Sequence, residues 1–223
     1  YLCYKGLGMR KLKINKPLDV PGWTNSIQHR EYKDLVAELP ENPRVLEIGC
    51  GYGRSTWAWL DALPPTSTYC VLDNFRLTSK WLHKSQYTNY KRINPIIASF
   101  IWKCNKRNTT QREIFDRFIS YHPNQQIIKT VWEMDSDDWI VSKEFTNNWD
   151  LVYLDDRHEY EVMKQWLSIF SNVSIVCGDD YLPRFQGIID AVDEYSKDKN
   201  VYKHITRAAN FFIIKNKSRL TNT

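Results

Sequence analysis

Residues 47–55 read Glu-Ile-Gly-Cys-Gly-Tyr-Gly-Arg-Ser, and this glycine cluster is the strongest indication of the fold in the sequence. A short apolar run at 44–48 leads into it and predicts a buried strand. The residues at 55–63 follow with helical spacing and stop at Pro64 and Pro65, which predicts a helix. A glycine turn between a buried strand and a helix is typical of α/β folds, whose ligands bind at the carboxyl ends of the strands.

The spacing of the glycines bears on the kind of ligand. The cluster has the pattern G-x-G-x-G, with an acid, Glu47, two residues before the first glycine. A dinucleotide site is expected to show G-x-G-x-x-G and to hold a pyrophosphate at the helix N-terminus. An NAD-dependent oxidoreductase is therefore the weaker interpretation. A carboxylate at position 47 would repel a pyrophosphate, and it suits a ligand with an amino or sulfonium group.

Strands and helices alternate along the rest of the chain. Further strands are predicted at 68–72, 127–132, 150–154 and 173–177, and further helices at 30–39, 160–170 and 187–195. Two β-rich runs at 202–206 and 211–214 predict a C-terminal hairpin. This order predicts a Rossmann-like, mostly parallel sheet with helices on both faces and an antiparallel hairpin at one edge.

The length of 223 residues predicts a single domain with two unusual segments. Residues 1–27 form a basic N-terminal extension. Residues 76–126 are too long for one crossover and predict an inserted helical lid that is rich in basic and aromatic side chains. The net charge is +5, but ten acids gather at 133–161. A basic segment beside an acidic one favours an anionic partner for the first and a cation or hydroxyl site in the second.

Composition excludes several classes of protein. Hydrophobic residues make up 42% of the chain and aromatic residues 14%, which excludes a largely disordered protein. No apolar run approaches the length of a membrane-spanning helix, and the N-terminal residues do not resemble a secretory signal. The five cysteines form no C-x-x-C pair, so we expect free, buried thiols and a reducing, cytoplasmic location.

Acids and amides follow the predicted strands at the places where a nucleoside would bind. Asp73 ends the second strand about 20 residues past the last glycine, where a carboxylate can hold both ribose hydroxyls. Asn74 is its neighbour. Asp135 and Ser136 follow the third strand, where they could accept a hydrogen bond from an adenine amino group. Alternatively, Asp135 and Ser136 mark the start of a helix.

Together these stretches resemble the class I S-adenosylmethionine-dependent methyltransferases. The resemblance rests on EIGCGYGRST, on Asp73 after a strand, and on WDLVYLDDRHEYE and IVCGDDY, and it covers about residues 28–215. The last two motifs are most similar to the small-molecule O-methyltransferases of methyltransferase family 24. The resemblance implies a seven-stranded sheet and S-adenosylmethionine as cofactor. It also implies that Glu47, Gly49, Gly51 and Gly53 line the methionine end of the cofactor, with Asp73 on the ribose. The predicted cofactor site further includes Cys50, Ser55, Asn74, Asp135, Ser136 and Asp155.

Three acids predict a metal site. Asp155 ends the fourth strand, and Asp179 and Asp180 end the fifth, so adjacent crossovers bring them to one edge of the sheet. Converging carboxylates repel one another unless a cation or hydrogen-bond donors intervene, and oxygen ligands suit Mg²⁺. The resemblance implies that the metal would lower the pKa of a bound hydroxyl. Alternatively, Asp156 caps the next helix and Asp179 holds its own backbone turn.

The general base is less clearly predicted. Some related sugar methyltransferases place an aspartate base two residues after the first acid, and Arg157 stands at that position here. His158 is the next candidate because a histidine titrates near neutral pH, and Asp155 is the acid beside it. Arg157 could instead pair with Asp155 or Asp156, or bind an anionic substrate.

The favoured function is therefore O-methylation of a hydroxyl on a sugar or another small metabolite. A different class of function, nucleic-acid binding or modification, is indicated by the basic and aromatic segment 76–126. The chain lacks the N/D-P-P-Y/F motif that amino-methylating nucleic-acid enzymes normally show. A scaffold that has lost its chemistry is a further alternative, because Arg157 replaces the expected base.

Overall fold

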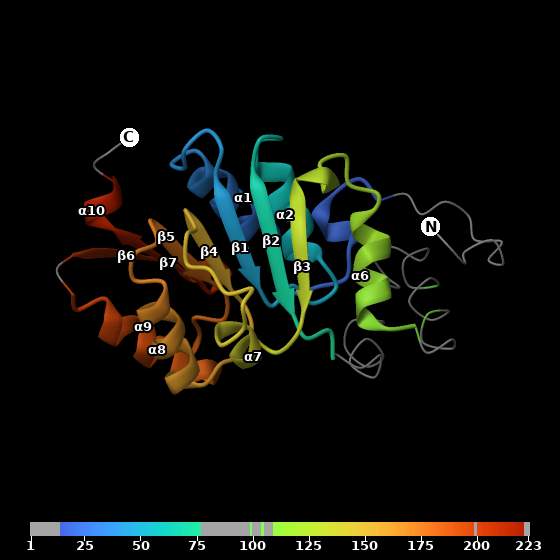
Figure 1. Ribbon diagram of the computed structural model, residues 1–223. Coiled ribbons are helices and arrows are strands. Elements are labelled where there is room, and N and C mark those ends of the chain that lie inside the picture. The colour runs from blue at the N-terminus through green and yellow to red at the C-terminus, as the bar shows by residue number, and fades with distance from the viewer. Residues whose placement is uncertain (1–13, 77–98, 100–103, 105–108, 199, 221–223) are drawn as a thin grey trace.

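The described part of the chain contains seven strands, and all of them belong to one sheet (Figure 1). The computed structural model describes residues 14–76, 99, 104, 109–198 and 200–220. The strand order is β3-β2-β1-β4-β5-β7-β6. The strands are β1 (Arg44–Ile48), β2 (Thr68–Asp73), β3 (Ile128–Glu133), β4 (Leu151–Leu154), β5 (Ile175–Gly178), β6 (Val201–Thr206) and β7 (Phe211–Asn216).

The first five strands run parallel, and β7 lies antiparallel between β5 and β6. The predicted seven-stranded, mostly parallel sheet with a reversed terminal hairpin is confirmed. The register makes the carboxyl ends level, since Ile48 lies opposite both Leu72 and Leu154, and Leu154 lies opposite Gly178. The residues that follow β1, β4 and β5 therefore meet at one edge of the sheet.

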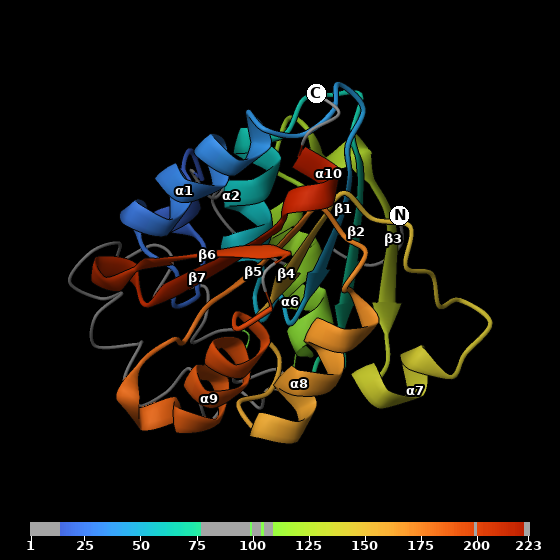
Figure 2. The ribbon, with the colours of Figure 1, turned by 90° about the vertical axis from the view of Figure 1, so that its left-hand side faces the viewer.

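Helices cover both faces of the sheet (Figures 1 and 2). One face carries α1 (Ser26–Val36), α2 (Arg54–Ala62) and α6 (Gln111–Ile119); the other carries α7 (Ser136–Ile140), α8 (Tyr160–Ile169) and α9 (Gln186–Tyr195). A short helix, α10 (Lys217–Leu220), follows β7. The 3-10 turns are η1 (Pro17–Asp19), η3 (Gln125–Ile127), η4 (Pro183–Phe185) and η5 (Arg207–Ala209).

Each face of the sheet has its own hydrophobic core, because side chains alternate between the two faces along every strand. On the first face, Tyr32 stacks on Trp59 with ring centroids 4.0 Å apart, and Tyr153 meets both rings edge-on. On the second face, Trp166 stacks on Phe170 beside the apolar residues of β4 and β5. Large buried aromatic side chains contribute much of the apolar area that stabilises such a fold.

The first helix begins four residues earlier than predicted. The Asn25 side chain accepts hydrogen bonds from the backbone N–H of Ile27 and Gln28, at 2.8 and 3.2 Å. The Gln28 side chain accepts one in return from the Asn25 N–H, at 2.7 Å. This reciprocal capping box fixes the helix start at Ser26. The prediction was wrong because it relied on apolar spacing, which begins only further along the helix.

Part of the predicted N-terminal extension belongs to the body of the domain. Arg54, the first residue of α2, donates hydrogen bonds to the carbonyls of Val20 and Thr24, at 2.7 and 3.2 Å. Gly22 lies so close to Arg54 that an added Cβ would come within 2.5 Å of the Arg54 Cβ. Val20 is fully buried. Residues 14–25 are therefore packed against α2, and residues 1–13 of the predicted extension lie outside the described part of the chain.

The predicted lid is also corrected over part of its length. Helix α6 falls within the predicted segment 76–126, yet Phe115 and Ile119 are buried in the core on the first face of the sheet. This helix is the crossover between β2 and β3. Most of residues 77–108, including most of the basic and aromatic side chains behind the nucleic-acid alternative, lie outside the described residues.

Two compositional predictions can be compared with the structure. Cys50, Cys70 and Cys177 are free and buried, as expected. Cys104 is buried as well, and Cys3 falls outside the described part of the chain. Among the helices of the described residues, none has the length and apolar character needed to cross a membrane.

Candidate functional site

The glycine cluster lies at the carboxyl end of β1, and packing dictates its first glycine. Gly49 has a φ of +85°, and an added Cβ would lie 2.1 Å from the Asp155 carbonyl oxygen. The Asp155 N–H donates to the Ile48 carbonyl at 2.8 Å, so the chain after β4 crosses directly over this position. Gly53 is the N-cap of α2 with a φ of +95°, and its added Cβ would touch Phe115 of α6. Both glycines therefore permit close packing around the turn.

Asp73 braces the glycine turn from the end of β2. Its Oδ2 accepts hydrogen bonds from the N–H groups of Cys50 and Gly51, each at 2.9 Å. Its Oδ1 accepts one from the Phe75 N–H at 2.6 Å. Burial raises the pKa of Asp73, and these N–H donors oppose the rise. Because Oδ1 has one donor and two lone pairs, it retains the capacity to accept a hydroxyl group.

Glu47 was expected to face the ligand, but it is buried beneath the glycine turn. Its side chain is fully buried, and Oε2 accepts hydrogen bonds from the hydroxyls of Thr56 and Tyr69, at 2.5 and 2.7 Å. Burial raises the pKa of Glu47 to about 7, although these hydroxyls and Ser55 act to lower it. Its Oε1 is buried and has no hydrogen-bond partner among the residues that the structure describes. Glu47 therefore ties the first turn of α2 to β1 and β2 from beneath the glycine turn.

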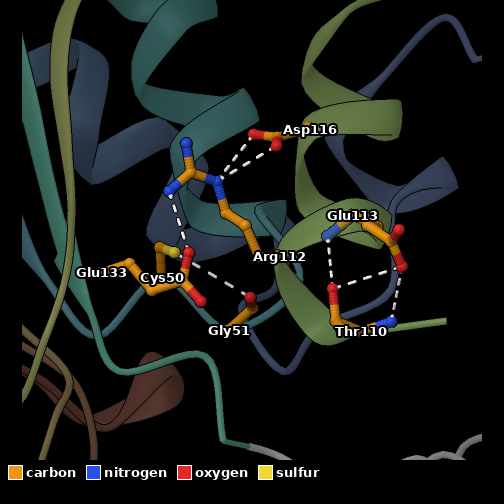
Figure 3. Close-up of polar contacts among 7 residues, drawn as sticks. All are labelled: Cys50, Gly51, Thr110, Arg112, Glu113, Asp116 and Glu133. Atoms are coloured by element: carbon orange, nitrogen blue, oxygen red, sulfur yellow. Dashed lines mark hydrogen bonds and ion pairs between the residues drawn. The ribbon is translucent and has the colours of Figure 1, made fainter. Parts of the chain in front are cut away.

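The start of α6 covers the glycine turn, which the sequence did not predict. Gln111 is buried, and its Nε2 donates to the Gly51 carbonyl at 2.8 Å. Figure 3 shows the neighbouring Arg112 between Asp116 on its own helix and Glu133 at the end of β3. The Arg112 guanidinium thus connects α6 to the adjacent strand end.

A sequence signal for this contact does exist. Thr110 and Glu113 form a reciprocal capping box at the start of α6, which Figure 3 also shows. The pattern T-x-x-E ahead of apolar residues at helical spacing predicts a helix start. It would have located the first turn of α6, although it says nothing of the contact between Gln111 and Gly51.

The ends of β2 and β3 are joined by the predicted nucleoside-binding residues. Asn74 Nδ2 donates to Asp135 Oδ1 at 2.8 Å, and Arg76 pairs with Asp135 Oδ2 at 2.8 Å. The alternative interpretation of Asp135 and Ser136 as a helix start is confirmed, since α7 begins at Ser136 with Asp135 at the cap position. The Ser136 hydroxyl donates to Asp156, two residues after the end of β4, at 2.5 Å.

Arg157 turns toward α7. Its Nη2 donates to Asp137 Oδ1 at 2.6 Å, and its Nε lies 3.9 Å from Asp156 Oδ2. Of the roles predicted for Arg157, pairing with Asp156 agrees with this geometry. Asp156 therefore contacts both Ser136 and Arg157, which joins the loop after β4 to the start of α7.

Asp155 and Asp179 place negative charge at the ends of β4 and β5. Asp155 Oδ2 accepts from the Tyr153 hydroxyl at 3.3 Å, and Asp179 Oδ1 accepts from the Asp180 N–H at 2.7 Å. Burial raises the pKa of Asp155 well above its usual range, and repulsion from Asp179 and Asp180 adds to the rise. Burial likewise raises the pKa of Asp179 to about 6, although a hydrogen bond from Gln28 of α1 opposes it. The ionised forms of these carboxylates are therefore disfavoured, and a cation beside them would stabilise the ionised forms.

Asp180, the residue after Asp179, is hydrogen-bonded to His158. The His158 Nε2 lies 2.8 Å from Asp180 Oδ2, and Arg184 Nη2 lies 3.5 Å from Asp180 Oδ1. The backbone of Asp180 has a φ of +61°, which is uncommon for a residue other than glycine. The structure thus brings His158 and Asp180 together, as one hydrogen-bonded pair.

The residues predicted to bind a metal do not form a metal site in this geometry. Across residues 14–76, 99, 104, 109–198 and 200–220, no three His, Cys, Asp or Glu side chains are placed to share an ion. Each of the three acids is hydrogen-bonded within the protein. Asp155 accepts from Tyr153, Asp179 from the Asp180 N–H, and Asp180 from His158.

The comparisons with known proteins bear on the fold. No family model matches the chain, and no curated protein is similar to it. Many solved structures are similar over most of their length, and three of them illustrate the likeness. An O-methyltransferase from Bacillus cereus in complex with SAH is 15% identical, with a TM-score of 0.51, and the match covers 88% of this chain and 84% of that one. The SAH-bound methyltransferase PaMTH1 from Podospora anserina is 16% identical, with a TM-score of 0.53 and coverage of 87% and 80%. A methyltransferase from Geobacter sulfurreducens is 10% identical, with a TM-score of 0.56 and coverage of 86% and 78%.

The chain has the class I methyltransferase fold. In this fold the glycine turn after β1 and the acid at the end of β2 lie side by side, as the hydrogen bonds of Asp73 to Cys50 and Gly51 require. The likeness, at 10–16% identity, concerns the fold. The chemistry of this methyltransferase-fold chain is therefore argued from its own residues.

Proposed function

We propose that this protein is an S-adenosylmethionine-dependent methyltransferase that methylates a hydroxyl group of a small molecule. The observation that carries the proposal is the row of acids at the carboxyl edge of the sheet, where Asp73, Asp155 and Asp179 follow three strands around the glycine turn. The similar structures from Bacillus cereus and Podospora anserina are methyltransferases with SAH bound, which supports this assignment.

The acids around the glycine turn suit this cofactor. S-adenosylmethionine carries an ammonium and a sulfonium group, and a cationic ligand beside Asp155 and Asp179 would stabilise their ionised forms, which burial disfavours. The Asp73 carboxylate has acceptor capacity left for a ribose hydroxyl. Asn74, Asp135 and Ser136 are assigned to the adenine side, and the glycine turn, with Gly51 at its centre, to the methionine side. Glu47 acts from beneath, by holding α2 in place.

His158 is proposed as the general base. S-adenosylmethionine, when bound, supplies a methyl group on a positively charged sulfur that is a good leaving group. His158 accepts the proton of the acceptor hydroxyl while the new oxygen–carbon bond forms and the carbon–sulfur bond breaks, which releases S-adenosylhomocysteine. Asp155 lies two residues after Tyr153 at the end of β4 and contributes negative charge beside the reacting groups. No step is assigned to a metal, because the carboxylates do not fit one.

Titration calorimetry of the purified protein with S-adenosylmethionine and, separately, with NAD tests the cofactor assignment. We expect micromolar affinity for S-adenosylmethionine and no binding of NAD. Asp155→Asn should weaken binding of S-adenosylmethionine roughly tenfold, because a carboxylate near a cationic ligand contributes about 1–2 kcal/mol. Asp138→Asn, on the exposed side of α7, removes the same charge and should leave the affinity unchanged. A folded protein that does not bind S-adenosylmethionine would contradict the proposal.

A further inference from the structure

We propose that the acceptor site works without a divalent metal, and that Asp180 acts instead as a positioning residue that orients the His158 imidazole. This inference rests on the proposed function, in which His158 is the base. It begins from the disagreement described above, because the acid after β5 that was expected to bind a metal is hydrogen-bonded to a histidine.

Two contacts hold the His158 ring, one at its edge and one on its face. Its Nε2 lies 2.8 Å from Asp180 Oδ2. Its face stacks on the Phe185 ring, with centroids 3.9 Å apart and planes 14° from parallel. A hydrogen bond fixes one edge of the ring, and stacking restricts its tilt. The imidazole therefore has little freedom to rotate, although its side chain remains about 40% exposed.

The Asp180 carboxylate is shared by two nitrogen donors. One oxygen faces the His158 Nε2, and the other lies 3.5 Å from Arg184 Nη2. A Mg²⁺ ion at this position would need at least one of those oxygens together with other oxygen ligands. Asp155 and Asp179 are hydrogen-bonded to donors of their own, and among the described residues they do not complete a metal site with Asp180.

The backbone holds His158, Asp180 and Phe185 close together. Asp180 has a φ of +61°, and the turn that follows leads through η4, which carries Arg184 and Phe185, into α9. Gly187, in the first turn of α9, lies so close to the 158–160 backbone that an added Cβ would come within 2.6 Å of the His158 carbonyl oxygen. The segment that carries Phe185 is therefore packed directly against the segment that carries His158.

The consequence for the reaction concerns the tautomer of His158. A carboxylate only accepts hydrogen bonds, so Asp180 requires a proton on Nε2. A neutral imidazole then has its lone pair on Nδ1, and Nδ1 becomes the nitrogen that takes the proton from the acceptor hydroxyl. Asp180 does not touch the reacting atoms in this scheme. It determines which nitrogen of His158 is basic.

Nitrogen-15 NMR of the protein labelled at histidine tests the positioning role. At a pH where the imidazole is neutral, we expect His158 in the Nε2–H form in the wild type. Asp180→Ala should give a mixture of both tautomers, whereas Asp180→Asn should retain the Nε2–H form because its amide oxygen still accepts a hydrogen bond. Glu161→Ala, an exposed acid on α8, is the matched control and should leave the spectrum unchanged. A wild-type tautomer that persists in folded Asp180→Ala would overturn the positioning role.

Electron paramagnetic resonance with Mn²⁺ as the probe tests the metal independence. We expect no binding at millimolar Mn²⁺, either with the wild type alone or with S-adenosylmethionine present. Micromolar Mn²⁺ binding that disappears in Asp180→Asn would overturn the inference. Calorimetry with S-adenosylmethionine on the same samples separates the two proposals. Normal cofactor binding beside tight Mn²⁺ binding rejects only this inference, whereas absent cofactor binding rejects the proposed function.

Discussion

Gly49 illustrates how single residues in the glycine turn serve packing and ligand binding together. The Asp155 carbonyl occupies the space where a Cβ would lie, and the φ of +85° disfavours any other residue. The sequence predicted this turn, the acids at the strand ends and His158. It did not predict that Glu47 points beneath α2, or that Asp180 bonds to His158, because both directions depend on neighbours distant in the chain.

A substitution at Gly49 should therefore destabilise the whole domain. We expect Gly49→Ala to cost at least about 3 kcal/mol, because a 2.1 Å contact with backbone forces β1 and the chain after β4 apart. Gly51→Ala is the matched control. An alanine there carries the strain of a φ of +57°, which costs about 1–2 kcal/mol. Thermal unfolding of both variants gives the comparison, and equal losses would contradict the packing role of Gly49.

Glu47 should make stability depend on pH. Its pKa is about 7 in the folded protein and 4.5 in the reference state, so the folded state binds the proton more tightly. The resulting stabilisation is full below about pH 4.5 and is lost as the pH rises through 7. Glu47→Gln should remove this loss and be more stable than the wild type at pH 8, by up to about 3 kcal/mol.

Denaturant unfolding at pH 5 and pH 8 measures this difference. Glu41→Gln, at an exposed position, is the control and should follow the wild type at both pH values. A Glu47→Gln protein that loses as much stability between pH 5 and pH 8 as the wild type would show that Glu47 does not carry the effect.

At the scale of elements, most strands and helices were predicted to within two residues, because their apolar periodicity is strong. The start of α1 was missed, since a capping box rather than periodicity determines it. The role of α6 was missed for a different reason. Its segment was treated as an insertion, whereas Phe115 and Ile119 fill the space between the glycine turn and the core.

Phe115→Ala should distinguish a core helix from a lid. Phe115 is 1% exposed and packs edge-on against Phe75, so its removal should cost about 3–5 kcal/mol and lower the Tm by roughly 10 °C. Asp116→Ala, one residue along, removes an exposed ion pair with Arg112 and should cost less than about 1 kcal/mol. A small loss from Phe115→Ala would favour a lid that does not contribute to the core.

At the scale of the whole molecule, the terminal hairpin is part of the sheet rather than an addition to it. Strand β7 pairs with both β5 and β6, and its four residues from Phe211 to Ile214 are at most 3% exposed. The sequence predicted the hairpin from its β-rich runs. It could not by itself place β7 between β5 and β6, because that order depends on pairing across the whole sheet.

Removing the hairpin should prevent folding. A chain that ends at residue 200 lacks β7 and exposes the edge of β5, so we expect no cooperative thermal transition by circular dichroism. A chain that ends at residue 216 keeps both strands and should unfold cooperatively within a few degrees of the full chain. Cooperative unfolding of the shorter chain would show that the first five strands are a folding unit on their own.

The antiparallel direction of β7 has a practical consequence for experiments on immobilised protein. Lys215 lies opposite Ile175, the first residue of β5, so α10 emerges at the amino edge of the parallel strands. Figure 1 shows α10 at the end of the sheet away from the tips of the β1 and β2 arrows. A biosensor surface coupled after residue 220 would therefore leave the glycine turn and the acids around it facing the flowing solution.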